Sequence, residues 1–241
     1  DIESYINTDN YTDFIERLKR DDEWSGPIPA IENLEHGADA FDDNGLAEDG
    51  SGWVAFNYKP LPSTFWPTNG STDDVIIRLP EPFRTATCGD DTGEFSRDVY
   101  FANLALLEMA MKDLTEITTP AINETHVCAD LNHDGILSEV QRILKRPSYV
   151  GGASGQPVKR MSYPEGTQFI HTVRYVGFDG ERVVPSVRMK EVRYMKKVKD
   201  YSVAELASLY GNERQEKIDG NLPVYSDHGD KGLNNGMGWE V

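Results

Sequence analysis

The hydrophobic pattern of the chain is densest within residues 97–114, where apolar residues occupy nearly every position from Val99 to Met111. Ser96 precedes this stretch as an N-cap residue, and a helix with so little polar surface must be buried. A second helical pattern covers residues 202–217, where Ser202 and Glu205 have the spacing of a capping box. The pattern therefore predicts one central buried helix and one capped helix that is more polar.

Strand patterns rich in β-branched and aromatic residues surround these helices. They cover residues 53–58, 75–79, 167–178 and 182–198, and the last two are joined through Asp179-Gly180, a strong hairpin signal. Together the elements predict an α+β fold. It has a central buried helix, short strands, a long C-terminal β-hairpin and many irregular loops.

The organisation along the chain divides into three parts. Residues 1–147 form an aromatic-rich, helical and calcium-binding part, in which residues 11–20 are expected to be a docking helix. Residues 148–166 are rich in Gly, Ser and Pro and form a connection, and residues 167–241 carry the hairpin and the second helix. We expect these parts to pack into one globular unit.

Charge excludes several classes of partner. The 241 residues carry a formal net charge of −17 and the pI is about 4.6, so nucleic acid and anionic membrane surfaces are repelled. No apolar run approaches the roughly 20 residues that a membrane span requires. The chain opens with Asp1 and is expected to be a mature, processed polypeptide.

One segment, residues 130–138, has a spacing that implies a specific chemistry. A hard cation takes six to eight oxygens, and alternate residues of a tightly curled loop point inward. Gly135 stands at loop position 6, where the chain must turn, and Leu137 at position 8 is the expected apolar anchor. The candidate oxygen ligands are the side chains of Asp130, Asn132, Asp134 and Ser138 at positions 1, 3, 5 and 9 and the carbonyl of Ile136 at position 7.

This spacing resembles the EF-hand and dockerin-type calcium loops. It departs from both at position 12, where Gln141 stands in place of a Glu or Asp. The reduced ligand charge predicts weak binding, with a Kd of about 10⁻⁴ to 10⁻³ M, at a site filled outside the cytoplasm. A short helix, Ser138–Lys145, is expected to follow, and the alternative interpretation is an Asx-rich turn that caps this helix.

Cys88 and Cys128, the two cysteines, lack metal-ligand spacing and predict one disulfide, in agreement with an extracytoplasmic protein. Such a bond brings Asp90 and Asp91 to the entrance of the calcium loop. We expect one of these aspartates to supply the carboxylate missing at position 12, with Glu139 as the local competitor. The alternative is that both aspartates only terminate a surface turn.

Three further segments resemble poorly characterised bacterial exported proteins: Trp53–Pro60, Thr64–Asp74 and Asn234–Trp239. Some members of that group continue beyond such a tryptophan into a segment with a CxxCH haem site. The resemblance implies a periplasmic or secreted protein. It also implies that haem is carried only in a longer parent chain.

Two function hypotheses follow. The first is an extracytoplasmic, calcium-stabilised binding or accessory module. It either binds an unknown protein or polymer partner or forms the N-terminal part of a c-type haem electron-transfer protein. The second is a secreted hydrolase that uses paired carboxylates on carbohydrate or another polymer. No GxSxG, HExxH or phosphate-binding glycine loop occurs, which favours the first and leaves catalytic residues unassigned. His228, flanked by Asp227 and Asp230, is a further candidate site residue.

Overall fold

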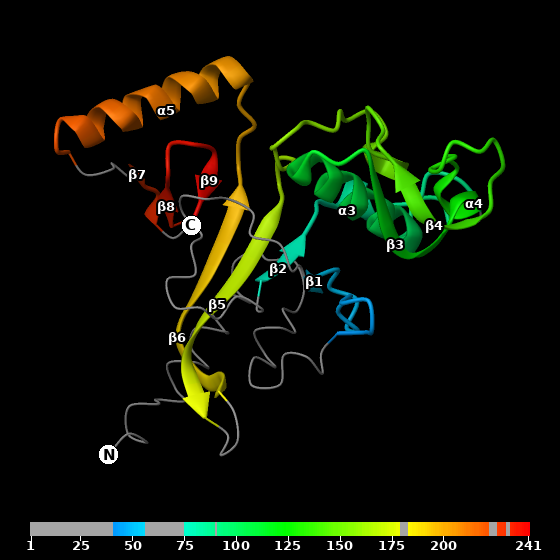
Figure 1. The fold of residues 1–241 in the computed structure, drawn as a ribbon, viewed down its shortest axis with the longest axis horizontal. Coiled ribbons are helices and arrows are strands. Elements are labelled where there is room, and N and C mark those ends of the chain that lie inside the picture. The colour runs from blue at the N-terminus through cyan, green and yellow to red at the C-terminus, as the bar shows by residue number, and fades with distance from the viewer. Residues whose placement is uncertain (1–40, 56–74, 90, 179–182, 222–225, 230–231) are drawn as a thin grey trace. The chain divides into compact units, whose positions relative to one another are not determined.

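The computed structural model describes residues 41–55, 75–89, 91–178, 183–221, 226–229 and 232–241, and only the backbone within 171–192. The chain forms two compact units. Figure 1 labels the helices and strands of the described residues. One comprises residues 1–78 and 170–193, and the other comprises residues 79–169 and 194–241. The predicted division at residues 148–166 stays a prediction.

The first unit contains β-strands from four segments of the chain. They lie side by side in the order β1 (Val54–Ala55), β2 (Val75–Arg78), β5 (Gln168–Phe178) and β6 (Val183–Lys197), and the ends of β5 and β6 extend into the second unit. Trp53 is fully buried, and the Arg78 guanidinium lies 4.6 Å from the centre of its ring. The predicted strands at 75–79, 167–178 and 182–198 are confirmed. Residues 56–58 and the predicted turn 179–180 lie outside the described residues.

The central buried helix is confirmed as α3 (Arg97–Lys112), the core of the second unit. The Ser96 hydroxyl accepts a hydrogen bond from the Val99 N–H at 3.3 Å, as the N-cap prediction requires. Asn103 is a fully buried polar residue on this helix. Its amide nitrogen donates to the carbonyls of Phe83 and Val150, at 2.9 and 3.1 Å, and its oxygen accepts from the Val150 N–H. These bonds tie α3 to two short 3-10 helices, η3 (Glu81–Arg84) and the neighbouring η4 (Gly151–Ala153).

Gly151, at the start of η4, is a site where any side chain is expected to be costly. Its φ is +62°, and a Cβ there would lie 2.4 Å from Val99 Cγ1 and 2.6 Å from the Thr85 carbonyl oxygen. Gly151→Ala should therefore lower the free energy of unfolding by about 2 kcal/mol, measured by chemical denaturation. Gly155→Ala is the matched control, because a Cβ at Gly155 meets nothing within 4 Å. Equal losses in the two variants would contradict this packing.

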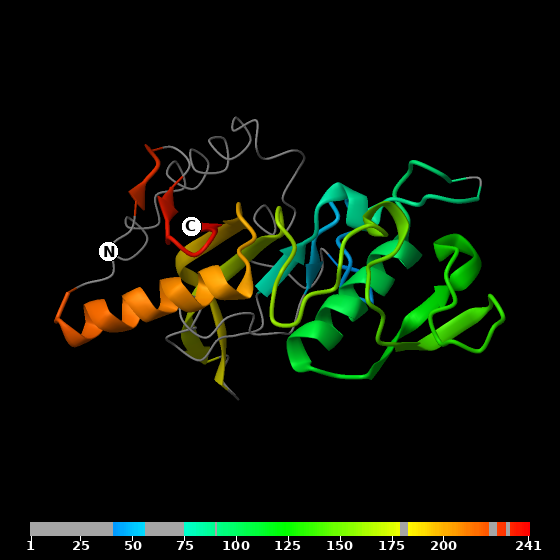
Figure 2. The same cartoon turned by 90° about the horizontal axis from the view of Figure 1, so that it is seen from above.

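The predicted helix at 138–145 is wrong. The segment is a strand, β4 (Glu139–Leu144), paired antiparallel with β3 (Glu116–Asn123), which the sequence pattern also missed. Val140 and Ile143 are buried, and their three-residue spacing fits a helix face as well as an irregular strand face. Pairing with β3 favours the strand over the helix, because it gives the backbone N–H and C=O groups hydrogen-bond partners and buries both β-branched side chains. Figure 2 shows the two-stranded sheet beside α3, with α4 (Glu124–Val127) and the following loop at its end.

The second predicted helix is confirmed as α5 (Val203–Ile218). Ser202 and Glu205 form the predicted capping box, in which each side chain bonds the backbone N–H of the other residue. The residues after α5 are rich in glycine, which does not favour regular strands. Nevertheless they form three short strands, β7 (Ser226–Asp227), β8 (Leu233–Asn234) and β9 (Trp239–Glu240), and β9 pairs with the end of β6.

The structure thus confirms the α+β class. Among the residues that the structure describes, each helix is too short or too polar to cross a bilayer.

Candidate functional site

The predicted calcium loop follows the single-turn helix α4 and leads into the strand β4. Together, α4 and the loop connect the paired strands β3 and β4. The ladder pair Asn123 and Glu139 closes the loop at its base, and the Glu124 N–H donates to the Ser138 carbonyl at 3.0 Å. Leu131 is held from the far end of the strand, where the Leu144 N–H donates to its carbonyl at 2.8 Å. The EF-hand arrangement of helix, loop and helix is therefore absent here, although the loop itself is tightly held.

The side chains at loop positions 1, 3 and 5 turn inward and lie together. Asp130 accepts hydrogen bonds from the N–H groups of Asp134 and Gly135, at 3.2 and 2.9 Å. The Asn132 side chain accepts from the same Asp134 N–H at 3.0 Å, and its amide donates to the Asp134 carboxylate at 2.8 Å. Gly135 has a φ of +85°, which supplies the sharp turn predicted at position 6. The structure therefore gathers three of the predicted ligands.

Other predicted features of the loop are placed differently. Leu137 is 45% exposed and does not anchor the loop, so that prediction is wrong. Leu131 at position 2 is fully buried and anchors the loop instead, because it is the residue whose backbone bonds to β4. Ile136 and Gln141 are exposed, and Gln141 lies on β4, outside the curled part of the loop.

Glu124, on the first turn of α4, is the residue of this site that sequence reasoning missed. Its side chain is fully buried. One carboxylate oxygen accepts from the N–H groups of Leu131 and Asn132, at 2.5 and 3.3 Å, and the other accepts from the Ser138 N–H at 3.0 Å. A buried carboxylate is tolerated when several backbone donors satisfy it, so Glu124 fixes both ends of the loop. No spacing rule points to it, since it lies outside the loop motif.

The donor set of the loop suits a hard, oxygen-preferring cation only in part. Each carboxylate oxygen that accepts one backbone hydrogen bond keeps further lone-pair capacity for a metal. However, no three His, Cys, Asp or Glu side chains gather as a metal site in the part of the chain that the structure describes. Arg146 also donates to the Asp130 carbonyl, which places a guanidinium beside the loop. A bound ion would therefore depend on amide, carbonyl and water oxygens as well as on Asp130 and Asp134.

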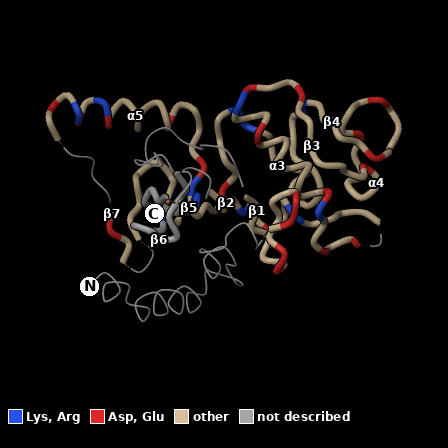
Figure 3. Tube along the Cα trace, turned by 60° about the horizontal axis from the view of Figure 1, so that its bottom comes forward, with Lys and Arg blue, Asp and Glu red and all other residues tan. Residues whose placement is uncertain are grey.

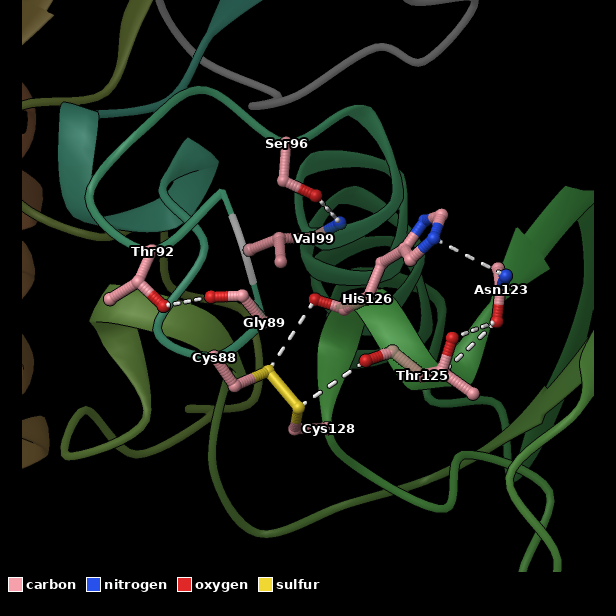
Figure 4. Close-up of a disulfide and its surroundings, with 9 residues drawn as sticks. All are labelled: Cys88, Gly89, Thr92, Ser96, Val99, Asn123, Thr125, His126 and Cys128. Atoms are coloured by element: carbon pink, nitrogen blue, oxygen red, sulfur yellow. Dashed lines mark hydrogen bonds between the residues drawn. A yellow bond between two sulfur atoms is a disulfide. The ribbon is translucent and has the colours of Figure 1, made fainter.

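The predicted disulfide is confirmed. Cys88 and Cys128 are bonded, with their Cα atoms 6.4 Å apart, and Cys128 is the C-cap residue directly after α4 (Figure 4). The bond ties the segment that enters α3 to the start of the loop. A second link lies close by, where His126 Nδ1 is 2.7 Å from an Asp98 carboxylate oxygen.

Asp90 and Asp91, the two aspartates that follow Cys88, were predicted to reach the loop. Asp91 is exposed, and its carbonyl accepts the Glu94 N–H at 3.0 Å. Asp90 lies outside the described residues. Their contribution to a calcium site, like that of Glu139 as competitor, stays a prediction. Figure 3 shows acidic positions along the chain between α4 and β4.

His228, the other candidate, pairs with a single carboxylate. Its Nδ1 lies 3.2 Å from a carboxylate oxygen of Glu240, between β7 and β9. Asp227 uses its side chain to accept the Gly229 N–H at 2.8 Å, and Asp230 lies outside the described residues. Among the described residues, His228 is not part of a cluster of three or more His, Cys, Asp or Glu side chains that could hold a metal ion.

Comparison with known proteins identifies relatives of the chain. A family described as "-like lipoprotein" matches residues 1–241. An "Uncharacterized lipoprotein" of Aquifex aeolicus (strain VF5) is 34% identical over 226 residues, which is 90% of this chain and 36% of that protein. The chain therefore spans about a third of the length of this relative. No solved structure matches the chain.

Proposed function

The chain belongs to this family of lipoproteins, and we propose that it acts as an exported accessory domain that is stabilised by calcium and binds a partner. The observation that carries the proposal is the inward-facing group of Asp130, Asn132 and Asp134. Calcium is abundant outside the cytoplasm, where a site with a Kd of about 10⁻⁴ to 10⁻³ M is filled. The bound ion would act as a clip on the loop.

The loop is suited to this role because its shape is already set. The β3–β4 ladder, the buried Glu124 carboxylate and the Cys88–Cys128 bond hold its two ends. A preorganised loop loses little conformational entropy when it binds an ion, which offsets the small number of carboxylates.

Calcium should raise the melting temperature of the protein. A ligand that binds only the folded state stabilises it by RT ln(1 + [L]/Kd), about 1.4 kcal/mol at ten times Kd. For a chain of this size, the expected rise is about 3–6 °C. Asp130→Ala and Asp134→Ala should abolish the rise. Asp43→Ala should keep it, because Asp43 is an exposed acidic residue outside the loop. If the wild type has the same melting temperature in chelator and in millimolar calcium, the loop is only a turn and does not bind calcium.

Haem is proposed only for the longer parent. The chain covers 36% of the Aquifex relative, so a parent of similar length has room for a CxxCH segment outside these residues. An intact-mass measurement and an absorption spectrum of the natively purified, full-length protein test this point. A Soret band with a covalent haem mass supports it, and a clean apo mass refutes it. The alternative, a secreted hydrolase, has no assigned catalytic residues among those that the structure describes.

A further inference from the structure

We propose that a small pocket in the second unit binds a neutral, hydroxyl-rich ring the size of one sugar residue. The pocket lies between residues 149–165 and Asp200, and it encloses about 220 Å³. At about 30 Å³ for each water, this volume corresponds to roughly seven waters. The residues that line it are Tyr149, Gln156, Pro157, Lys159, Ser162, Tyr163, Pro164, Glu165 and Asp200.

The strongest indication of a ligand is the hydroxyl group of Tyr149. Tyr149 is only 3% exposed, its ring packs edge-on against Phe83 at 4.8 Å, and its hydroxyl has no hydrogen-bond partner. Buried polar groups are nearly always hydrogen-bonded, so such a group in a pocket points to a missing acceptor. Burial, with a smaller contribution from the negative charge of Asp200, raises the pKa of Tyr149. The hydroxyl therefore stays neutral and able to donate.

The charges that line the pocket balance only when the adjacent Lys197 is included, and this balance favours a neutral ligand over an ion. The Asp200 carboxylate forms an ion pair with Lys159, lies 3.9 Å from the Lys197 ammonium and accepts from the Ser162 hydroxyl at 3.3 Å. Burial lowers the pKa of Lys197, and Asp200 opposes this shift. Glu165 accepts from the Asp200 N–H at 3.3 Å. Carboxylates held in this way keep acceptor capacity for ligand hydroxyls.

The walls of the pocket match the two kinds of surface that a sugar ring presents. Pro157, Pro164 and the Tyr163 ring supply apolar area for C–H faces. The Tyr149 hydroxyl, the Gln156 amide and the carboxylates supply donors and acceptors for hydroxyl groups. This inference gives the proposed binding role a ligand class, so it rests on that role. It does not depend on calcium.

Isothermal titration of the protein with glucose and with N-acetylglucosamine, each in calcium and in chelator, tests the inference. We expect saturable binding of at least one sugar in both conditions. Tyr149→Phe should weaken it about tenfold, since it removes one hydrogen bond and keeps the ring. The melting temperature of this variant should be no lower than that of the wild type, because the substitution removes a buried hydroxyl that makes no hydrogen bond in the folded protein. Tyr210→Phe is the matched control on the exposed surface of α5 and should bind normally.

Several outcomes would overturn the inference. Absence of saturable binding for both sugars in both conditions removes it, even if calcium still raises the melting temperature. Equal affinity of Tyr149→Phe and Tyr210→Phe also contradicts it, because the Tyr149 hydroxyl would then be a buried group without a role. Binding that occurs in calcium and vanishes in chelator would place the sugar site elsewhere. Binding in chelator with no thermal response to calcium would support the pocket and refute the calcium clip.

Discussion

Replacing Glu124 by alanine is expected to lower the free energy of unfolding by about 3–5 kcal/mol. The substitution removes the acceptor of three backbone N–H groups, those of Leu131, Asn132 and Ser138, and empties a fully buried position. Hydrogen bonds to charged groups contribute about 1.5–3 kcal/mol each, and buried donors without a partner are costly. Chemical denaturation measures the loss, and the melting temperature should fall by about 10 °C.

Two further variants show whether this loss comes from the carboxylate. Glu124→Gln keeps the size of the side chain and one acceptor oxygen. We therefore expect its free energy of unfolding to lie between those of the wild type and the alanine variant. Glu139→Ala removes an exposed carboxylate at the start of β4 and should change stability by no more than about 0.5 kcal/mol. If Glu124→Ala and Glu139→Ala lower the free energy of unfolding equally, the Glu124 carboxylate does not hold the loop.

Removing the disulfide is the second large effect. The Cys88–Cys128 bond spans a sequence separation of 40 residues, and the chain-entropy model gives a loop of that length about 4 kcal/mol of stabilisation. Cys88→Ser/Cys128→Ser and the reduced wild type should therefore melt about 8–16 °C below the oxidised protein. The two measurements should agree, since both remove the same cross-link.

Thiol titration is the control for this result. Unfolded but unreduced wild-type protein should contain no free thiol, because both cysteines are bonded. Two titratable thiols would contradict the bond. A double-serine variant that melts with the oxidised wild type would show that the bond does not stabilise the fold.

Elements with a strong and unambiguous local pattern could be predicted from the sequence. The helix α3 is apolar on nearly all sides and has Ser96 as cap, and α5 carries the Ser202–Glu205 capping box, so both helices were located within two residues. The long strands β5 and β6 were located in the same way from β-branched runs. In these segments local preference and tertiary packing agree.

Elements that depend on a distant partner could not be predicted. The segment Glu139–Leu144 has a pattern that fits either a helix or a strand, and only its pairing with β3 makes it a strand. β3 itself contains Pro120 and a register shift between Thr118 and Ile122, which weaken its strand signal. Tertiary context overrides such weak local preferences.

The same distinction between local patterns and distant contacts applies to the candidate site. Spacing alone identified Asp130, Asn132 and Asp134, because ligands at alternate loop positions are local in sequence. Glu124 was missed because its role depends on α4 folding back over the loop. The Tyr149 pocket was missed because Asp200 reaches it from a segment 51 residues away. Sequence patterns carry no information on such contacts unless the fold is known.

Calcium binding by the loop is most directly tested by following the backbone amide signals of Asp134, Gly135 and Ile136 by NMR during a calcium titration. These amides donate to the side chains of Asp130, Asn132 and Asp134, so an ion held by those oxygens must move them. The account predicts saturable shifts with a Kd of about 10⁻⁴ to 10⁻³ M, confined to the loop and absent in Asp130→Ala. Small linear shifts spread over acidic residues throughout the chain would contradict it.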